Sequence, residues 1–276
     1  MAPLYAHSLD ASSPSFALLA SRHEGKKSDK KKKYEPFFLV TLAKSGSHLI
    51  LKVLTEMTGR PRVWVSSGNP LSGKLYSQKE YPWTHFCLSP LLERLIADRK
   101  VIVMVRDLRD LSISATHALH ADIAQWGKSP KICRKDFTQL SFPDQLMSVI
   151  KEESQMEAED KALIWNFSHS FPQAVALAQD PRVLVCRYEH LVGPHGGGSL
   201  QAQKEEIRKI AAYLEVSLSE QEVERISSTI YGDSKTYRKG QIEEWKRTFE
   251  PNHKELFKTK FGQYLISLGY EENDEW

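Results

Sequence analysis

The chain has 276 residues, of which 41% are hydrophobic, and this is enough to bury the core of one large α/β domain. The net charge of +3 is mildly basic, so the composition requires no nucleic-acid partner but suits an anionic small ligand. No segment approaches the roughly 20 consecutive apolar residues of a membrane span, and the three cysteines lack metal-ligand spacing. These features predict a soluble cytoplasmic protein with free thiols and no membrane-spanning segment.

The N-terminal 33 residues have the composition of a flexible basic tail. They are rich in serine, alanine and histidine, and they end in a lysine-rich run at residues 26–33. Such runs are usually solvated and disordered, although they also occur in segments that bind nucleic acid or membranes. The sequence therefore predicts a tail over residues 1–33 and one folded domain over residues 34–276.

An apolar run that begins at Phe37 predicts a buried strand, and it stops at the short polar loop Lys44-Ser45-Gly46-Ser47. Apolar residues then recur at helical spacing, so a helix follows the loop. The free N–H groups of a helix N-terminus attract anions, and the loop adds a lysine charge and hydroxyl donors. The segment predicts a phosphate site, the alternative being a plain polar turn with a capping serine. Because Lys44 precedes Gly46, it is not a Walker-type loop of the usual kind.

Two more apolar runs, at residues 101–105 and 182–188, predict further buried strands. Segments with helical periodicity alternate with the strands, and they cover residues 90–98, 111–124, 143–159, 161–177, 204–214 and 220–230. This alternation is typical of a single α/β domain whose central, mostly parallel sheet is flanked by helices. Ligands of such folds bind beyond the carboxyl ends of the strands, where Lys44 and Arg106 are both expected.

A second polar segment, from Arg106 to Ser114, follows the strand at residues 101–105. Asp107 or Asp110 is expected to cap a helix there, which places Ser114 about one turn into that helix. An arginine and a serine hydroxyl together suit a second phosphate. The alternative is that Arg106 pairs with one of the two aspartates and that Ser114 faces water.

Three further segments contain residues that suit catalysis, phosphate binding or a flexible connection. His85 follows Thr84, and histidine side chains suit proton abstraction when they face a cleft, although a lone histidine is more often packed in a core. Arg238-Lys239-Gly240 combines two cations with a glycine that lets the backbone approach a phosphate, or it forms a basic surface turn. The glycine-rich stretch at residues 195–199 lacks a charged anchor and is expected to be a flexible surface connection.

Taken in chain order, these segments resemble the cytosolic-type sulfotransferase family, which uses 3′-phosphoadenosine 5′-phosphosulfate as its donor. The loop at Lys44 is similar to the family's 5′-phosphosulfate loop, and Thr84-His85 is similar to its Thr-His pair with the catalytic base. Arg106 and Ser114 have the family's spacing for the 3′-phosphate, with Asp110 also in place. Residues 187–191 and 238–246 are similar to its Tyr-Glu-Asp-Leu-type and Arg-Lys-Gly signatures. The resemblance spans roughly residues 36–250 and implies a P-loop NTPase-like sulfotransferase architecture.

The resemblance also implies roles for individual residues. The enzyme would move a sulfuryl group in line to a hydroxyl or amine of a small-molecule acceptor, which the sequence does not identify. His85 would be the general base, and Lys44 would neutralise the leaving phosphate. The residues implied in donor binding are Lys44, Ser45, Gly46, Ser47, His48, Arg106, Ser114, Tyr188, Arg238, Lys239 and Gly240. No metal is implied, because cationic side chains supply the charge that Mg²⁺ supplies in kinases.

The chain departs from the family's pattern in several places. Leu49 stands where the family has a tryptophan that stacks on adenine, and Trp83 stands where a lysine often precedes the Thr-His pair. The family's dimerisation motif is missing from residues 230–237, so the oligomeric state stays open, a homodimer included. The aromatic residues that could line an acceptor site, or belong to the core, are Trp64, Tyr76, Tyr81, Trp83, Phe86 and Trp126.

Two other functions are compatible with the same residues. One is a small-molecule P-loop kinase with an unusual phosphate loop, for which Asp107 and Asp110 would be the Mg²⁺ ligands. The other is a non-catalytic nucleotide-binding or adaptor protein whose basic tail contacts an anionic partner. The altered loop sequence Ser47-His48-Leu49 is compatible with this second alternative.

Overall fold

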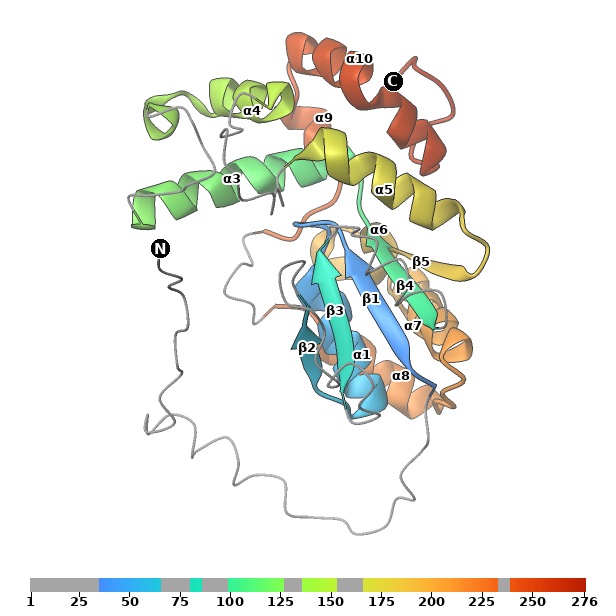
Figure 1. Ribbon diagram of the computed structural model, residues 1–276. Coiled ribbons are helices and arrows are strands. Elements are labelled where there is room, and N and C mark those ends of the chain that lie inside the picture. Colours follow the sequence, from blue (N-terminus) through green and yellow to red (C-terminus); the bar gives the residue numbers. More distant parts are fainter. Residues whose placement is uncertain (1–34, 66–79, 86–98, 127–135, 153–165, 233–238) are drawn as a thin grey trace, which may run out of the picture. The chain divides into compact units, whose positions relative to one another are not determined.

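A parallel β-sheet forms the centre of the folded unit Tyr34–Trp276, as the computed structural model shows (Figure 1). The structure describes residues 35–65, 80–85, 99–126, 136–152, 166–232 and 239–276. Within them the sheet has five strands in the order β2-β3-β1-β4-β5, and every pairing is parallel. The strands are β1 (Phe37–Thr41), β2 (Arg62–Trp64), β3 (Tyr81–His85), β4 (Lys100–Val105) and β5 (Val183–Arg187). The prediction of an α/β fold with a mostly parallel sheet is confirmed.

The register of the sheet aligns the ends of three neighbouring strands. Thr41, the last residue of β1, lies opposite His85 of β3 and opposite Met104 of β4. Arg106 follows directly after the end of β4. Because parallel strands end at one edge of a sheet, the loop at Lys44, His85 and Arg106 all arrive at the same edge. The sequence predicts this position for Lys44 and Arg106.

Helices pack on both faces of the sheet (Figure 1). Successive residues of a strand point to opposite faces, and apolar side chains on each face pack against helices. Phe37 and Leu39 belong to one core, which contains side chains of α1 (Ser47–Thr58), α6 (Tyr188–Leu191), α7 (Leu200–Tyr213) and α8 (Glu220–Thr229). Phe38 and Val40 belong to the other core, which contains side chains of α3 (Leu108–Trp126), α4 (Phe142–Lys151), α5 (Phe167–Gln179), α9 (Trp245–Thr248) and α10 (Pro251–Ser267). Within the described ranges, short 3₁₀ helices cover Phe137–Gln139 and Pro194–Gly196.

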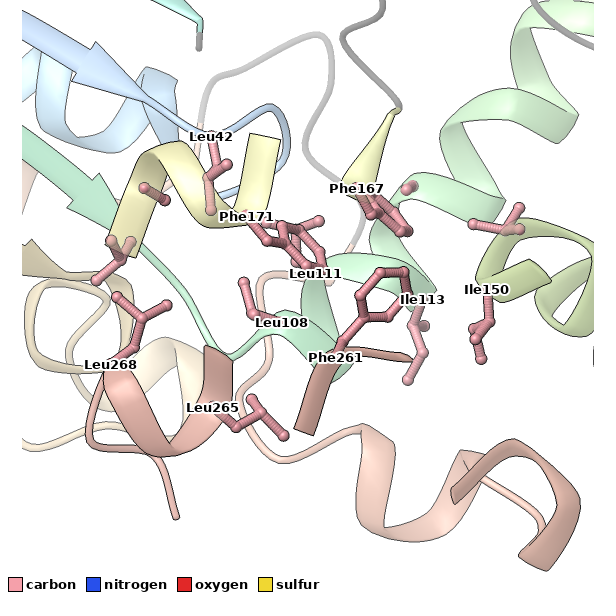
Figure 2. Packing of buried hydrophobic residues seen from close by; sticks show 14 of the residues in the cluster. Leu42, Leu108, Leu111, Ile113, Ile150, Phe167, Phe171, Phe261, Leu265 and Leu268 are labelled. Atoms are coloured by element: carbon pink, nitrogen blue, oxygen red, sulfur yellow. The ribbon is translucent and has the colours of Figure 1, made fainter. Parts of the chain in front are cut away.

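The second of these cores holds the start of α3 in place. Figure 2 shows Leu108 and Leu111 of α3 packed with Phe171 of α5 and Phe261 of α10. The rings of Phe171 and Phe261 lie 5.2 Å apart at 74°, which is a favourable edge contact. Arg106 therefore sits between a central strand and a helix whose first turn is fixed by apolar packing.

Capping residues set two helix boundaries that differ from the predicted ones. The helix predicted to reach residue 159 ends at Lys151, because Glu152 adopts a left-handed conformation with φ of 64°. The helix predicted from residue 161 begins at Phe167, because the side chain of Asn166 accepts the N–H of His169 as an N-cap.

Two other helices begin earlier than predicted, and the short helices α6 and α9 and the long helix α10 have no counterpart among the predicted helices. α7 begins at Leu200 rather than at residue 204, because the side chain of Ser199 caps it. α3 begins at Leu108 rather than at residue 111. α10 was not predicted, although Pro251 stands at its first position, where proline is favoured.

Several predicted features lie outside the described residues. These are the tail over residues 1–33, the helix over residues 90–98, Arg238, and the cysteines Cys87 and Cys133. Cys186 of β5 is fully buried and has a free thiol, as the sequence predicts. Among the described residues, no helix combines the length and the apolar character that crossing a membrane requires.

Candidate active site

The loop after β1 turns tightly and opens α1. The hydroxyl of Ser45 donates to the carbonyl oxygen of Leu42 over 2.7 Å, so it is used within the loop rather than offered to a ligand. Lys44 and Gly46 both have left-handed backbones, with φ of 68° and 98°. Gly46 is the N-cap of α1, and its carbonyl oxygen accepts the N–H of Leu49 over 2.9 Å. The turn places the N-terminus of α1 at the carboxyl end of the sheet, where the sequence predicts an anion site.

Gly46 is required because the chain passes close to two side chains there. A Cβ atom at Gly46 would overlap the ring of Tyr188 and would lie 3.1 Å from Cε of Met104. The left-handed backbone adds strain for any other residue. Tyr188, the first residue of α6, therefore lies directly against the loop.

Replacing Gly46 by alanine is expected to destabilise the protein by about 2 to 5 kcal/mol, the sum of left-handed strain and overpacking against Tyr188. Gly59→Ala is the matched control, because Gly59 has a φ of 64° and an added Cβ would meet nothing within 4 Å. The control should cost only the backbone strain, about 1 to 2 kcal/mol. Urea unfolding measures both losses, and equal losses for the two variants would contradict the close approach to Tyr188.

Arg106 joins the loop to a distant segment of the chain. Its Nη1 donates to the carbonyl oxygen of Lys44 over 3.2 Å, and its Nη2 donates to that of Gln241 over 2.9 Å. The guanidinium also lies 4.4 Å from the centre of the Tyr188 ring. Its buried Nε has no hydrogen-bond partner within the part of the chain that the structure describes. Because buried charged donors are costly when left unpaired, the side chain is suited to an anionic ligand.

The segment at residues 239–242 is held beside the loop by backbone contacts. The hydroxyl of Tyr188 donates to the carbonyl oxygen of Gly240 over 2.8 Å. On its other side, the N–H of Ile242 donates to the carbonyl oxygen of Gly196 over 3.0 Å. A Cβ atom at Gly196 would lie 2.5 Å from the carbonyl oxygen of Gly240, so the two chains are in close contact. The glycine-rich stretch at residues 195–199, expected to be a flexible connection, thus supports this segment through fixed backbone contacts.

Three predicted donor-binding residues are less firmly tied to this cluster. Lys239 is exposed, and its ammonium lies 3.8 Å from Oε1 of Glu244. Ser114 is half-buried and lies nearly two turns into α3, farther along than predicted, because the helix begins at Leu108. Among the described residues no hydrogen bond joins Ser114 to the cluster, and Arg238 lies outside the described residues.

His48 lies exposed on the first turn of α1, beside the loop. Partial burial of the ring lowers its pKa, and the positive charges of Arg62 and Lys44 lower it further. The imidazole is therefore neutral at neutral pH, so it can contribute a hydrogen bond at the helix N-terminus but no charge.

His85 ends β3 at the same edge of the sheet. Its Nδ1 lies 2.9 Å from Oγ1 of Thr41. The ring is half-buried and makes edge contacts with Trp64 at 5.2 Å and Trp83 at 5.4 Å, and Trp64 is itself 46% exposed. His85 is therefore not packed in the core, and it lies between the loop and a partly exposed aromatic cluster.

A buried charge network that sequence analysis did not anticipate fixes the start of α3. The carboxylate of Asp107 accepts the backbone N–H and two side-chain N–H groups of Arg109 over 2.7 to 2.9 Å. The guanidinium of Arg109 lies 3.6 Å from the ring centre of Trp245 and 4.4 Å from that of Trp276. Asp107 thus pairs with Arg109, and the predicted alternative in which it pairs with Arg106 is wrong.

Asp110 lies buried in the first turn of α3. Its Oδ1 accepts the N–H of Trp245 over 2.8 Å, and its Oδ2 has no hydrogen-bond partner among the described residues. Burial raises the pKa of Asp110 to about 7, although the positive charge of Arg106 opposes the shift. The native state therefore keeps a proton that the unfolded state loses near its ordinary pKa. The free energy of unfolding that this bound proton contributes is complete at acidic pH. It is lost as the pH rises through about 7, the pKa of Asp110 in the native state.

Asp110→Asn keeps an oxygen for the N–H of Trp245 and removes the ionisable carboxyl group. Between pH 5 and pH 8 we expect the variant to gain about 2 to 3 kcal/mol of stability relative to the unmodified protein. Urea unfolding of both proteins at the two pH values measures this change, and the titration of other groups cancels in the difference. A stability difference that does not depend on pH would contradict the raised pKa.

These features define a class of protein. A parallel α/β domain that brings an anion loop, a bridging arginine and a histidine to the carboxyl edge of its sheet is suited to group transfer from a phosphorylated ligand. A family model of the sulfotransferase domain matches residues 35–269. The match covers most of the chain, and the protein therefore belongs to the sulfotransferase family.

Solved structures share this fold at low sequence identity. The crystal structure of mouse sulfotransferase SULT7A1 complexed with PAP has a TM-score of 0.61 and 16% identity, covering 86% of this chain and 88% of that chain. Retinol dehydratase in complex with androsterone and inactive cofactor PAP has a TM-score of 0.56 and 15% identity, covering 83% of this chain and 80% of that chain. Both likenesses confirm the predicted architecture. No curated protein matches the sequence.

Proposed function

We propose that this protein transfers a sulfuryl group from 3′-phosphoadenosine 5′-phosphosulfate to a hydroxyl or amine of a small-molecule acceptor. The double contact of Arg106 carries the proposal, because it joins Lys44 in the loop to Gln241 in the 239–242 segment. A donor with phosphates at both ends of its ribose needs two anion sites in fixed relation, and Arg106 ties the two candidate sites together. The two similar structures contain PAP, and 3′-phosphoadenosine 5′-phosphate is what this donor leaves after transfer.

The residues at the loop suit a 5′-phosphosulfate group. Lys44 would supply a positive charge, and the N–H groups at the start of α1 would supply donors, with Gly46 allowing the close approach. Ser47 and His48 would add side-chain hydrogen bonds. The hydroxyl of Ser45 is used to hold the loop, so this residue would act by fixing the loop's shape.

The residues at the second site suit the 3′-phosphate. The buried guanidinium of Arg106 retains an unpartnered Nε–H among the described residues. Gly240 has a left-handed backbone with a φ of 61°, and its lack of a Cβ would let a ligand approach closely. Lys239 would add a second cation, with Arg238 and Ser114 assigned from the family spacing. Tyr188 lies between the two sites and would contact the nucleoside.

The proposed mechanism uses the histidine at the end of β3. When bound, the donor supplies the sulfuryl group, and its S–O bond to the phosphate breaks as the acceptor atom bonds to sulfur. His85 takes the proton of the acceptor at Nε2 while its Nδ1 stays bonded to Thr41. Lys44 holds its positive charge where the departing phosphate gains negative charge. The chain's contribution is therefore positioning and charge stabilisation, together with one proton transfer.

The kinase alternative has little support from the site, because both candidate magnesium ligands have structural partners. Asp107 is bonded to Arg109 through both carboxylate oxygens. Asp110 is buried and bonded to the N–H of Trp245, and its raised pKa favours the protonated form, which is a poor ligand for Mg²⁺.

The proposed acceptor site lies beside His85. Trp64 and Trp83 pack edge to face at 4.5 Å, and both contact the ring of His85. The exposed part of Trp64 offers an apolar surface next to the proposed base. The acceptor would place its hydroxyl or amine at His85 and its apolar part near these rings.

Incubation with radiolabelled 3′-phosphoadenosine 5′-phosphosulfate and a metabolite extract tests the proposal. We expect a labelled product that forms in the presence of chelator, and its identification names the acceptor. Tight binding of the bisphosphate without transfer to any acceptor would instead support the non-catalytic alternative.

A further inference from the structure

Three polar side chains form a continuous chain from the loop to His85. Oγ of Ser47 lies 2.8 Å from Oγ1 of Thr41, and Oγ1 of Thr41 lies 2.9 Å from Nδ1 of His85. Thr41 is fully buried and Ser47 is 7% exposed, so the contact between their hydroxyls is shielded from water. Thr41 and His85 are register partners at the ends of β1 and β3, which fixes their separation through the sheet.

The hydroxyl of Thr41 has one proton and two neighbours, so it can donate to only one of them. If it donates to Nδ1 of His85, the proton of the neutral imidazole is on Nε2, and the ring cannot take a proton from an acceptor there. If it donates to Ser47, the Nδ1–H of His85 donates to Thr41, and Nε2 carries the lone pair of a base. The direction of the hydroxyl chain therefore decides whether His85 is a base toward the acceptor.

We infer that donor binding sets the direction of the hydrogen bonds in this chain. Thr41 is a positioning residue, because its hydroxyl links Ser47 to Nδ1 of His85 and so determines the tautomer of His85. The inference rests on the proposed function, because it requires the donor's 5′-phosphosulfate at the loop. An anion only accepts hydrogen bonds, so it draws the hydroxyl proton of Ser47 toward itself. The oxygen of Ser47 then accepts from Thr41, and the oxygen of Thr41 accepts from Nδ1 of His85.

The other arrangement is disfavoured once the anion is bound. If Thr41 continued to donate to His85 while Ser47 donated to the anion, two oxygens would face each other at 2.8 Å with no proton between them. The same direction also suits the proton transfer, since Thr41 accepts from Nδ1 while Nε2 takes up the acceptor proton. His85 therefore has the lone pair of a base at Nε2 only when the donor is bound. Proton abstraction from the acceptor then requires a bound donor.

Nitrogen NMR of protein labelled with ¹⁵N-histidine reports the tautomer of His85 directly, with the signal assigned by His85→Asn. We expect saturation with 3′-phosphoadenosine 5′-phosphate to shift the neutral ring from the Nε2–H form toward the Nδ1–H form. Calorimetry on the same samples measures binding. Binding without a change of tautomer would overturn the inference and leave the donor assignment standing, whereas the absence of binding would overturn both.

Variants separate positioning from a merely structural role. Thr41→Val preserves the shape of the side chain and removes the relay, so we expect no ligand-dependent tautomer change, a fall in kcat of about ten- to a hundredfold, and bisphosphate affinity within about twofold. Thr41→Ser restores the hydroxyl and should restore both readouts. Thr116→Val is the control, because Thr116 is a fully buried threonine whose hydroxyl donates only to the backbone of its own helix.

Ser47→Ala keeps the inference testable if Thr41→Val fails to fold. It removes the first hydroxyl and leaves the pair of Thr41 and His85 intact. At saturating bisphosphate we expect the tautomer of His85 in this variant to be the same as without ligand. A tautomer change in Ser47→Ala equal to that of the unmodified protein would contradict a relay through this residue.

Discussion

Replacing His85 by asparagine is expected to lower kcat by about 10²- to 10⁴-fold, which is the usual contribution of a general base. Affinity for 3′-phosphoadenosine 5′-phosphate should stay within about twofold, because the Nδ1 of His85 is bonded to Thr41 of β1, which lies outside the Lys44 loop. The expected pattern is therefore loss of turnover with intact donor binding. Steady-state transfer assays and calorimetric titration of the same protein samples measure the two quantities.

The control for this prediction is His169→Asn, because His169 is exposed on α5 and bonds to Gln173 of its own helix. This variant should match the unmodified protein in both measurements. Weakened bisphosphate binding in His85→Asn with preserved turnover would refute the assignment of His85 as the base.

Arg106→Gln is expected to weaken binding of 3′-phosphoadenosine 5′-phosphate by about 2 to 5 kcal/mol, which is roughly 30-fold to several thousandfold. The side chain is 6% exposed, so its charge acts on a ligand with little screening by water. Binding of adenosine 5′-phosphate, which lacks the 3′-phosphate, should change little. Calorimetric titration with both nucleotides measures the two affinities.

Comparing the affinities for the two nucleotides also separates two roles of Arg106, binding of the 3′-phosphate and support of the loop. If the variant disturbed the loop through the lost contact with Lys44, both nucleotides would lose affinity equally, and a 3′-phosphate role would be refuted. Arg182→Gln provides the charge-matched control, because Arg182 is exposed beside the amino end of β5 and pairs with Asp180. It should leave both affinities unchanged.

The centre of the sheet could be predicted from the sequence because β1 and β4 are buried on both faces. β2, which is mostly exposed, and β3 were not predicted as strands. Continuous apolar runs at Phe37 and Val101 have no other simple explanation in a chain with helical segments between them. Helix ends were predicted less well, since they depend on caps such as Asn166 and on a left-handed residue such as Glu152, which local periodicity does not reveal. α10 was not predicted because its buried face includes a histidine and a glycine as well as aromatic residues. This mixture weakens the helical pattern of apolar residues in the sequence.

The candidate site was predicted in part, since the strand ends and polar loops in the sequence place Lys44 and Arg106 at one edge of the sheet, while His85 was assigned from the family resemblance. Its internal contacts could not be predicted in the same way. Arg106 bonds to a carbonyl of Gln241, and any residue at that position would offer the same group. The chain from Ser47 through Thr41 to His85 likewise depends on strand register, which a single sequence does not specify for a strand buried on both faces.

The central claim is that the loop at Lys44 and the 239–242 segment form one site for a nucleotide with two separated phosphates. Calorimetric titration with 3′-phosphoadenosine 5′-phosphate, adenosine 5′-phosphate and ATP, each with and without chelator, tests it most directly. The predicted result is that the bisphosphate binds tightest and that chelator does not change its affinity. Tighter binding of ATP that is lost on adding chelator, or equal affinity for the bisphosphate and adenosine 5′-phosphate, would contradict the claim.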